Sequence, residues 1–333
     1  MKNFFLHLIL VLSLLEITSI QAQYTEVINS NRPGFSESPY SVGTRVYQFE
    51  SNFFYKNTSI EPTFSQPQSF GVDLLFRTSF FLEKLELNTQ LTYQRDKVAF
   101  KNIFSSHYFT TGLSRMSMGV KYLLFEPKYT DKTKEVRSWE RRFSFDKKRF
   151  IPSVAIYFGM NTNFVSEIYK TESITPKVGV LLQHNLTNEF NVISNVFYDK
   201  IGSDFSEISY TITATQNFSN QWSGFIEHQG IFQKYQNNLN FGAGVAYLFS
   251  ENFQINASTR FLQEGKSQGF YGSLGISYRI DRHQDSFTDL DQIGTKDNNK
   301  LSVFFNKILS LFKKKGNKKN KVKRSRKRKK RKK

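Results

Sequence analysis

Residues 241–263 read FGAGVAYLFSENFQINASTRFLQ, and this stretch decides the fold. From Phe253 to Phe261, every second residue is apolar or threonine, and the residues between them are Gln, Asn, Ser and Arg. Phe241 to Phe249 alternates in the same way, with glycine at two of the intervening positions. A period of two places successive side chains on opposite faces of a strand. The stretch therefore predicts two antiparallel strands joined by a tight polar turn.

The same alternation recurs along most of the chain, for example from Leu85 to Tyr93 and from Ile208 to Ala214. These segments run for about ten to fourteen residues, whereas strands usually have about five or six. A tilted strand needs about 9–11 residues to cross a bilayer. One face is apolar and the other is polar or glycine, as expected for a wall between hydrocarbon and a watery lumen. We therefore predict membrane-spanning strands rather than a soluble sandwich.

Three turns share one form, in which three polar residues lie between two apolar ones: Leu186–Phe190, Phe218–Trp222 and Phe249–Phe253. Their first residues are 32 and 31 positions apart, so each interval has the length of one hairpin. Tight turns on one side and longer loops on the other are typical of outer-membrane barrels. The aromatic residues beside the turns are expected to form an interfacial girdle.

The pattern predicts twelve strands, and ten or fourteen stay open because boundaries read from sequence err by several residues. An even number places both ends of the sheet in the periplasm, and closure leaves no unpaired edge in lipid. The expected fold class is all-β: a transmembrane antiparallel up-and-down β-barrel of about 12 strands over residues 44–280, with a short C-terminal amphipathic helix and a disordered basic tail. The predicted strands are 44–57, 67–79, 83–95, 108–123, 150–162, 175–186, 188–199, 206–218, 220–231, 238–249, 252–263 and 269–280.

The composition excludes several classes of protein. The chain has 333 residues and no cysteine, which excludes disulfide frameworks and thiol chemistry. Aromatic residues make up 16% of it, yet no run of eighteen apolar residues follows the N-terminus, so we expect no membrane-spanning helix in the mature chain. The sequence has no P-loop and no dinucleotide fingerprint, so we predict no cofactor.

The N-terminus has the form of an export signal. Lys2 precedes an apolar run from Phe4 to Leu15, and Ser19–Ala22 ends with a small residue at a suitable cleavage position. We predict a cleavable signal peptide over residues 1–22, with a buried N-terminal helix as the alternative. The expected location is the outer membrane of a Gram-negative bacterium, where lipid is one partner and a small-molecule solute another.

The formal net charge of +19 belongs almost entirely to the C-terminus. Residues 313–333 carry +16, residues 1–22 sum to zero, and residues 23–312 keep only +3. The chain is therefore a near-neutral body with a basic tail, and residues 281–300 are expected to be a polar linker between the two. The anionic-surface candidates in the tail are Lys313, Lys314, Lys315, Arg324, Arg326, Lys327 and Arg328.

Residues 301–312 predict a short amphipathic helix beside this tail. Apolar residues at helical spacing next to Lys and Arg are typical of an interfacial membrane anchor. The candidate partners of the tail are anionic lipid headgroups, an envelope polymer or a periplasmic or envelope protein, and an inert tail is the alternative. Nucleic acid is not an expected partner, because the chain is exported and the tail has no interleaved aromatic residues. The residues of the helix face are Leu301, Phe304, Phe305, Ile308, Leu309 and Phe312.

Four segments carry a resemblance to a known family: Ile28–Pro39, Val46–Glu50, Gly112–Tyr122 and Ile151–Gly159. Over roughly residues 28–280 the chain resembles the outer-membrane transporter barrels grouped with the MetA-pathway phenol-degradation family. The resemblance implies a β-barrel that passes small, often apolar solutes. The chain departs from the family pattern at Ser114-Arg115, at Met160–Thr162 and in a charged insertion over residues 126–149.

Strand parity places a set of charged side chains on the inner face of the predicted barrel. One interpretation is a lumen that filters solutes by charge. The other is a paired polar network that fills a narrow barrel, because barrels of about eight strands are already filled by side chains and those of sixteen are open. The lumen-lining candidates are Glu50, Asp73, Arg77, Glu86, Lys121, Glu227, Arg260 and Arg279.

The histidines give little support to a metal site or to an enzyme. They are not spaced as metal ligands and have no carboxylate cluster beside them, so we predict no metal. His184 alternates with Val180 and Leu182 and is expected near a strand end on the lipid side. A barrel lipase with a Ser–His pair would use it, but no Ser/His/Asn signature accompanies it. We therefore predict no catalytic residue and no enzyme.

Two segments leave the role of the barrel open. Residues 23–43 precede the first strand and either plug the lumen or lie beneath it. By strand parity, residues 126–149 lie in the periplasm, where they offer a contact surface. The favoured function is a channel for small solutes. The alternative is a non-transporting barrel that scaffolds or regulates an envelope assembly through residues 126–149 and 301–333.

Overall fold

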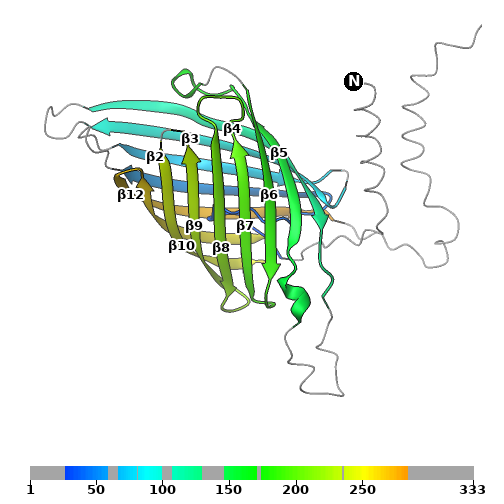
Figure 1. Cartoon of the computed structure of the whole chain (residues 1–333). Helices are drawn as coiled ribbons and strands as arrows, with labels where there is room; N and C mark the ends of the chain where they lie inside the picture. Colours follow the sequence, from blue (N-terminus) through cyan, green and yellow to red (C-terminus); the bar gives the residue numbers. More distant parts are fainter. Residues whose placement is uncertain are drawn as a thin grey trace, which may run out of the picture. The chain divides into compact units, whose positions relative to one another are not determined.

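The computed structural model describes residues 27–58, 67–80, 82–99, 107–129, 146–170, 174–234 and 236–283. They form twelve antiparallel strands, each paired with its neighbours in sequence, and β1 pairs with β12 to close the barrel (Figure 1). The predicted antiparallel β-barrel and its number of strands are confirmed. The strands are β1 (Val46–Thr58), β2 (Gln68–Thr78), β3 (Leu85–Ala99), β4 (His107–Phe125), β5 (Ser153–Asn161), β6 (Thr175–Asn185), β7 (Phe190–Asp199), β8 (Glu207–Asn217), β9 (Trp222–Gln233), β10 (Asn237–Ser250), β11 (Phe253–Glu264) and β12 (Ser267–Asp281).

The two ends of the barrel differ. Tight connections at 186–189, 218–221 and 251–252 define what we call the turn end, where β1 begins and β12 stops. The opposite, loop end carries β3 and β4, which are longer than predicted and pair as far as Ala99 and His107. The signal peptide, the helix and the basic tail lie outside the described residues, as do most of the linker and most of the insertion.

The start of β5 differs from the prediction. The predicted strand begins at residue 150, whereas Phe150 is the last residue of a 3₁₀ turn over Lys147–Phe150. The Asp146 side chain caps this turn by accepting a hydrogen bond of 3.1 Å from the backbone N–H of Lys148. The turn also uses the backbone N–H of Ile151, which donates to Lys148 O at 3.0 Å, and the strand begins at Ser153.

The barrel is apolar outside and polar inside. Large apolar side chains such as Leu74, Ile226 and Leu274 are exposed on the outer face, and the last two are each 66% accessible. Inward-facing residues such as Gln48 and Asn195 are buried. A soluble protein does not expose a continuous apolar surface of this kind, so the outer face is suited to hydrocarbon. In the part of the chain that the structure describes, no helix has the length and hydropathy of a membrane-crossing helix.

Aromatic pairs lie at the turn end, as expected for a girdle. The ring centroids of Trp222 and Tyr247 are 4.9 Å apart, and those of Phe249 and Phe253 are 6.0 Å apart. Trp and Tyr rings bring both an apolar body and a polar group to the membrane–water boundary.

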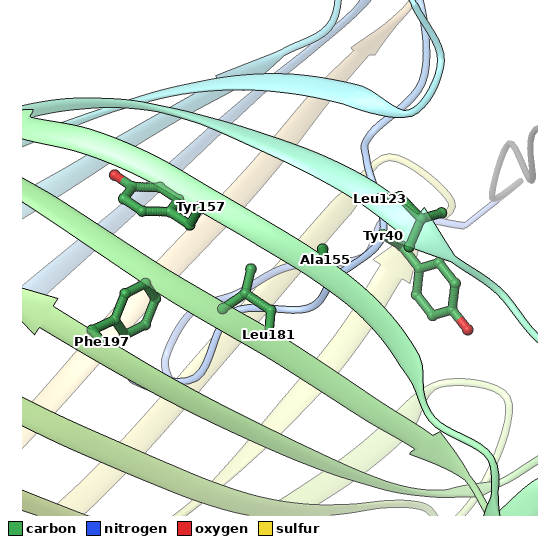
Figure 2. Close-up of a cluster of buried hydrophobic side chains, with 6 residues drawn as sticks. All are labelled: Tyr40, Leu123, Ala155, Tyr157, Leu181 and Phe197. Carbon is green, nitrogen blue, oxygen red and sulfur yellow. The ribbon is translucent and has the colours of Figure 1, made fainter. Parts of the chain in front are cut away.

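A cluster of buried apolar side chains lines the inner wall across four neighbouring strands (Figure 2). Tyr157 and Phe197 meet edge to face with ring centroids 5.5 Å apart. Each ring occupies space left by a glycine on the adjacent strand, because a Cβ on Gly119 would clash with Tyr157 and one on Gly179 would clash with Phe197. The cluster consists of Leu123, Ala155, Tyr157, Leu181 and Phe197 from β4 to β7, with Tyr40 from the segment before β1.

Candidate functional site

Residues 27–43, called the plug segment below, lie inside the barrel near its turn end. Ten of the twelve strands contribute hydrogen bonds, ion pairs or apolar contacts to this segment. It has no helix or strand of its own, and nearly all of its residues are buried or half-buried. Irregular backbone that is buried needs hydrogen-bond partners from elsewhere. The partners are supplied by side chains that point inward from the strands.

Three inward-facing carboxylates bind the backbone of the plug segment. They are Glu50, Glu227 and Glu86, all predicted from strand parity to line the lumen. The hydrogen bonds run from Arg32 N to Glu50 Oε2 (2.9 Å), from Phe35 N and Ser36 N to Glu227 Oε2 (2.9 and 3.2 Å) and from Val42 N to Glu86 Oε2 (3.0 Å). Each carboxylate thus acts as an anchor for irregular backbone.

Two buried cations, Arg77 and Lys121, hold Glu50 and Glu86 in place. Arg77 donates to Glu86 at 2.9 Å and to Glu50 at 3.1 Å, and all three side chains are fully buried. Lys121 lies 2.9 Å from Glu86 and also donates to the Ser38 carbonyl of the plug segment at 2.8 Å. Buried charges are tolerated only when they are paired in this way. The network therefore joins β1, β2, β3 and β4 to the plug segment.

Arg32 gives the plug segment a charge of its own. Its guanidinium pairs with Asp73 at 2.8 Å. Burial alone would lower the pKa of Arg32, but the carboxylates of Asp73, Glu50 and Glu37 outweigh burial and raise that pKa above its ordinary value. Arg32 therefore stays charged inside the barrel.

Arg260 closes the network on the opposite wall. Its Nε lies 3.2 Å from Glu227, and its guanidinium carbon lies 3.7 Å from the ring centroid of Phe35. It also donates to the carbonyl of Pro33. A guanidinium stacked on a ring and paired with a carboxylate is held in one orientation.

The structure places all eight lumen candidates on the inner side, and each is buried. Seven of them surround the plug segment. Arg279 lies apart from the others, where it donates to Asn252 Oδ1 at 2.7 Å and lies 3.5 Å from Asp281. Strand parity thus located the charged side chains, and the structure shows which of them meet.

Sequence reasoning missed the neutral side chains that hold the plug segment. The Asn195 side chain accepts a hydrogen bond from Glu37 N at 3.1 Å and donates one to Glu37 O at 2.8 Å. It thus satisfies both backbone groups of Glu37, as the backbone of a paired strand would. Tyr40 Oη lies 2.7 Å from Ser153 Oγ. Inward-facing amides and hydroxyls gave the only signal, and they occur on every strand.

Arg115 is a further inward-facing cation. It has the same strand parity as Ser117 and Lys121 and is paired in register with Thr92. Unlike Lys121 it is exposed, and in the described part of the chain no hydrogen bond or ion pair is recorded for it. Its exposure indicates solvent in the lumen on the loop side of the plug segment.

A cavity of about 540 Å³ lies between the plug segment and the wall at the turn end. Its walls come from the ends of β6 to β11 and from their connecting turns. Nine Asn and Gln side chains and seven Ser and Thr side chains line it, and Arg32 and Glu189 are its charged residues. We call this cavity the vestibule.

A second hollow lies on the outer face and is separate from the lumen. Phe53, Phe70, Val245 and Leu274 surround it, over small residues of β10, β11 and β12. These side chains belong to the apolar belt, so the hollow is suited to acyl chains.

The histidines lie apart from the lumen network. His184 is half-buried and alternates with the inward-facing Gln183, as expected for the lipid side of β6. His228 lies between the rings of Tyr210 and Phe241, with centroids 5.5 and 4.4 Å away. Among the described residues, no three His, Asp or Glu side chains form a group that could hold a metal ion.

Three solved structures are similar to this chain, and the first of them supports the fold. An outer membrane channel from Pseudomonas putida F1 has a TM-score of 0.54 at 9% identity, over 76% of this chain and 100% of that one. The CymD monoaromatic hydrocarbon channel gives 0.40 at 9% identity, over 72% of this chain and 90% of that one. The KdgM porin in complex with disordered oligogalacturonate gives 0.42 at 8% identity, over 70% and 99%. A comparison with curated proteins finds no match.

The family comparison covers both the plug segment and the barrel. Residues 30–280 match the family model described as "Putative MetA-pathway of phenol degradation". The match spans well over half of the chain and begins within the plug segment. The chain therefore belongs to this MetA-pathway phenol-degradation family of β-barrel proteins.

Proposed function

We propose that this protein is an outer-membrane channel for small solutes. The observation that carries the proposal is the closed barrel with an apolar outer face and a hydrogen-bonded polar interior. Such a wall separates hydrocarbon from water, which is the requirement for a transmembrane pore. Membership of the family supports the same function.

The plug segment is the proposed barrier to flow. Hydrogen bonds and ion pairs attach it to the wall, and water can replace such contacts when the segment moves. The vestibule lies on its turn side, and the exposed Arg115 lies on its loop side. We propose that solutes pass when the segment shifts between these two wet regions.

Three further proposals concern catalysis, the C-terminal segments and the insertion. We propose that the protein is not an enzyme. We also propose that the basic tail and the amphipathic helix bind anionic surfaces. The insertion at 126–149 and residues 301–333 would carry the alternative scaffolding role; most of the insertion and all of residues 301–333 lie outside the described residues.

Single-channel recording on the purified full chain in planar bilayers tests the proposal. We expect brief openings in KCl, because a non-covalent plug held by polar contacts exchanges with water. The matched control is a bilayer that received the heat-denatured protein. Silence from both the full chain and a variant without residues 27–43, when both are shown to be folded, would reject a channel function.

A further inference from the structure

The vestibule contains polar side chains that the protein itself does not use. Asn191 and Asn217 point inward at the turn end of β7 and β8, and Gln254 does so on β11. All three are at least partly accessible, and within the described residues no hydrogen bond is recorded for their amide groups. By contrast, Gln183 and Asn31 in the same cavity bind Ser38 of the plug segment. The three amides are therefore available to a solute.

The buried charges around the vestibule are already matched. Arg32 is paired with Asp73 at 2.8 Å. Glu227, whose carboxylate binds the backbone of the plug segment, is paired with Arg260 at 3.2 Å. Glu189 lies in the exposed turn at the rim. Away from Glu189 at the solvated rim, an ionic solute in the vestibule would lose hydration without gaining an unpaired counter-charge.

Register brings hydroxyl groups beside the free amides. Thr215 is the cross-strand partner of Asn191, and Ser223 is the partner of Asn217. The ring of Phe225 lines the same cavity and lies over Gly244, where a Cβ would clash with it. The wall thus offers paired donors and acceptors next to an apolar ring.

This chemistry selects one class of solute. An amide presents a donor and an acceptor side by side, and so does a pair of neighbouring hydroxyls on a sugar. The C–H face of a sugar ring can cover the Phe225 ring. An apolar solute would leave the amides without water or partner, which costs free energy. The volume of about 540 Å³ falls within the range of about 300–1,000 Å³ for small-molecule sites.

We infer that the vestibule binds uncharged, hydroxyl-rich solutes of the size of a disaccharide, through Asn191, Asn217 and Gln254. The inference deepens the proposed channel function, because it places the solute on the path at the turn end. It differs from the apolar solutes that the family resemblance implies.

Tryptophan fluorescence provides a test that does not depend on conductance. The chain has two tryptophans, and Trp139→Phe leaves only Trp222, which begins β9 beside the vestibule and packs its ring against Tyr247 of the girdle. The W139F protein in detergent is titrated with maltose, with gluconate and with toluene. We expect saturable changes with maltose alone. Asn191→Leu with Asn217→Leu should weaken maltose binding by about tenfold or more, because two solute hydrogen bonds are lost.

The matched control is Gln229→Leu with Asn240→Leu, two lumen amides that bind each other at 2.9 Å outside the vestibule. This pair should leave the maltose dissociation constant within about twofold, since both partners are replaced together. The inference is overturned if maltose gives no saturable change, if gluconate or toluene binds as well, or if the two pairs of substitutions act alike. Maltose binding without bilayer currents would reject the channel function and leave the binding site standing.

Discussion

Deleting residues 27–43 should raise the mean single-channel conductance by roughly tenfold or more. The plug segment fills the turn end of a lumen that is intermediate between the filled barrels of about eight strands and the open barrels of sixteen. The barrel should remain folded after the deletion, because two sets of ion pairs within the wall are retained. Arg77 stays paired with Glu50 and Glu86, and Arg260 stays paired with Glu227. The measurement compares current histograms of the deletion variant and the full chain in KCl.

A second variant separates the effect of releasing the plug segment from an effect on folding of the barrel. Asn195→Leu removes both hydrogen bonds to Glu37 and leaves every ion pair intact. It should lengthen the openings without changing the thermal unfolding of the barrel in detergent. Equal conductance of the full chain and a folded deletion variant would show that the plug segment is not the barrier.

Replacing Arg77 should destabilise the barrel more than any other single substitution in the lumen. Arg77→Met leaves Glu50 and Glu86 buried with too little positive charge beside them. Breaking a buried pair by removing one partner costs about 3–5 kcal/mol. The free energy of unfolding in detergent, measured with guanidinium and followed by circular dichroism, should fall by that amount.

Arg115→Met is the matched control for this prediction. The residue type, the substitution and the lumen location are the same, but Arg115 is exposed, and no hydrogen bond is recorded for it within the described residues. Its free energy of unfolding should change by less than about 1 kcal/mol, as for solvated charges. Equal effects of the two substitutions would mean that the Arg77 network contributes nothing specific.

The barrel could be predicted from the sequence because the pattern that specifies its strands lies within each short stretch of the chain. An inward and an outward side chain alternate at every strand position, and two different solvents enforce this difference over ten residues or more. The predicted strand boundaries were wrong where the structure departs from the alternation for local reasons. Asp146 caps a 3₁₀ turn before β5, and β3 and β4 extend beyond the bilayer length, where no solvent contrast marks the strand end.

The plug segment could not be predicted in the same way. Residues 27–43 have no period, and their partners are distant in sequence: Ser30 meets Ser277, which is 247 positions away. Parity indicated that Glu50, Glu86 and Glu227 face inward, but not that they bind backbone N–H groups. Four of the eight lumen candidates are acidic and four are basic, so the inward charge gave no signal of a further partner. The partners of the plug segment come together only when the barrel closes around it.

A disulfide lock on the plug segment tests the central claim most directly. Ser30 Oγ of the plug segment and Ser277 Oγ of β12 are 2.7 Å apart, near the S–S bond length of about 2.05 Å. The chain has no cysteine of its own, so Ser30→Cys with Ser277→Cys introduces a single bridge. The control pair is Ser258→Cys with Ser273→Cys, whose oxygens are also 2.7 Å apart but both lie in the wall. We predict that the oxidised Ser30–Ser277 variant is silent in bilayers and that reductant restores openings, while the control conducts in both states. Currents through the oxidised variant that equal those after reduction would contradict the account.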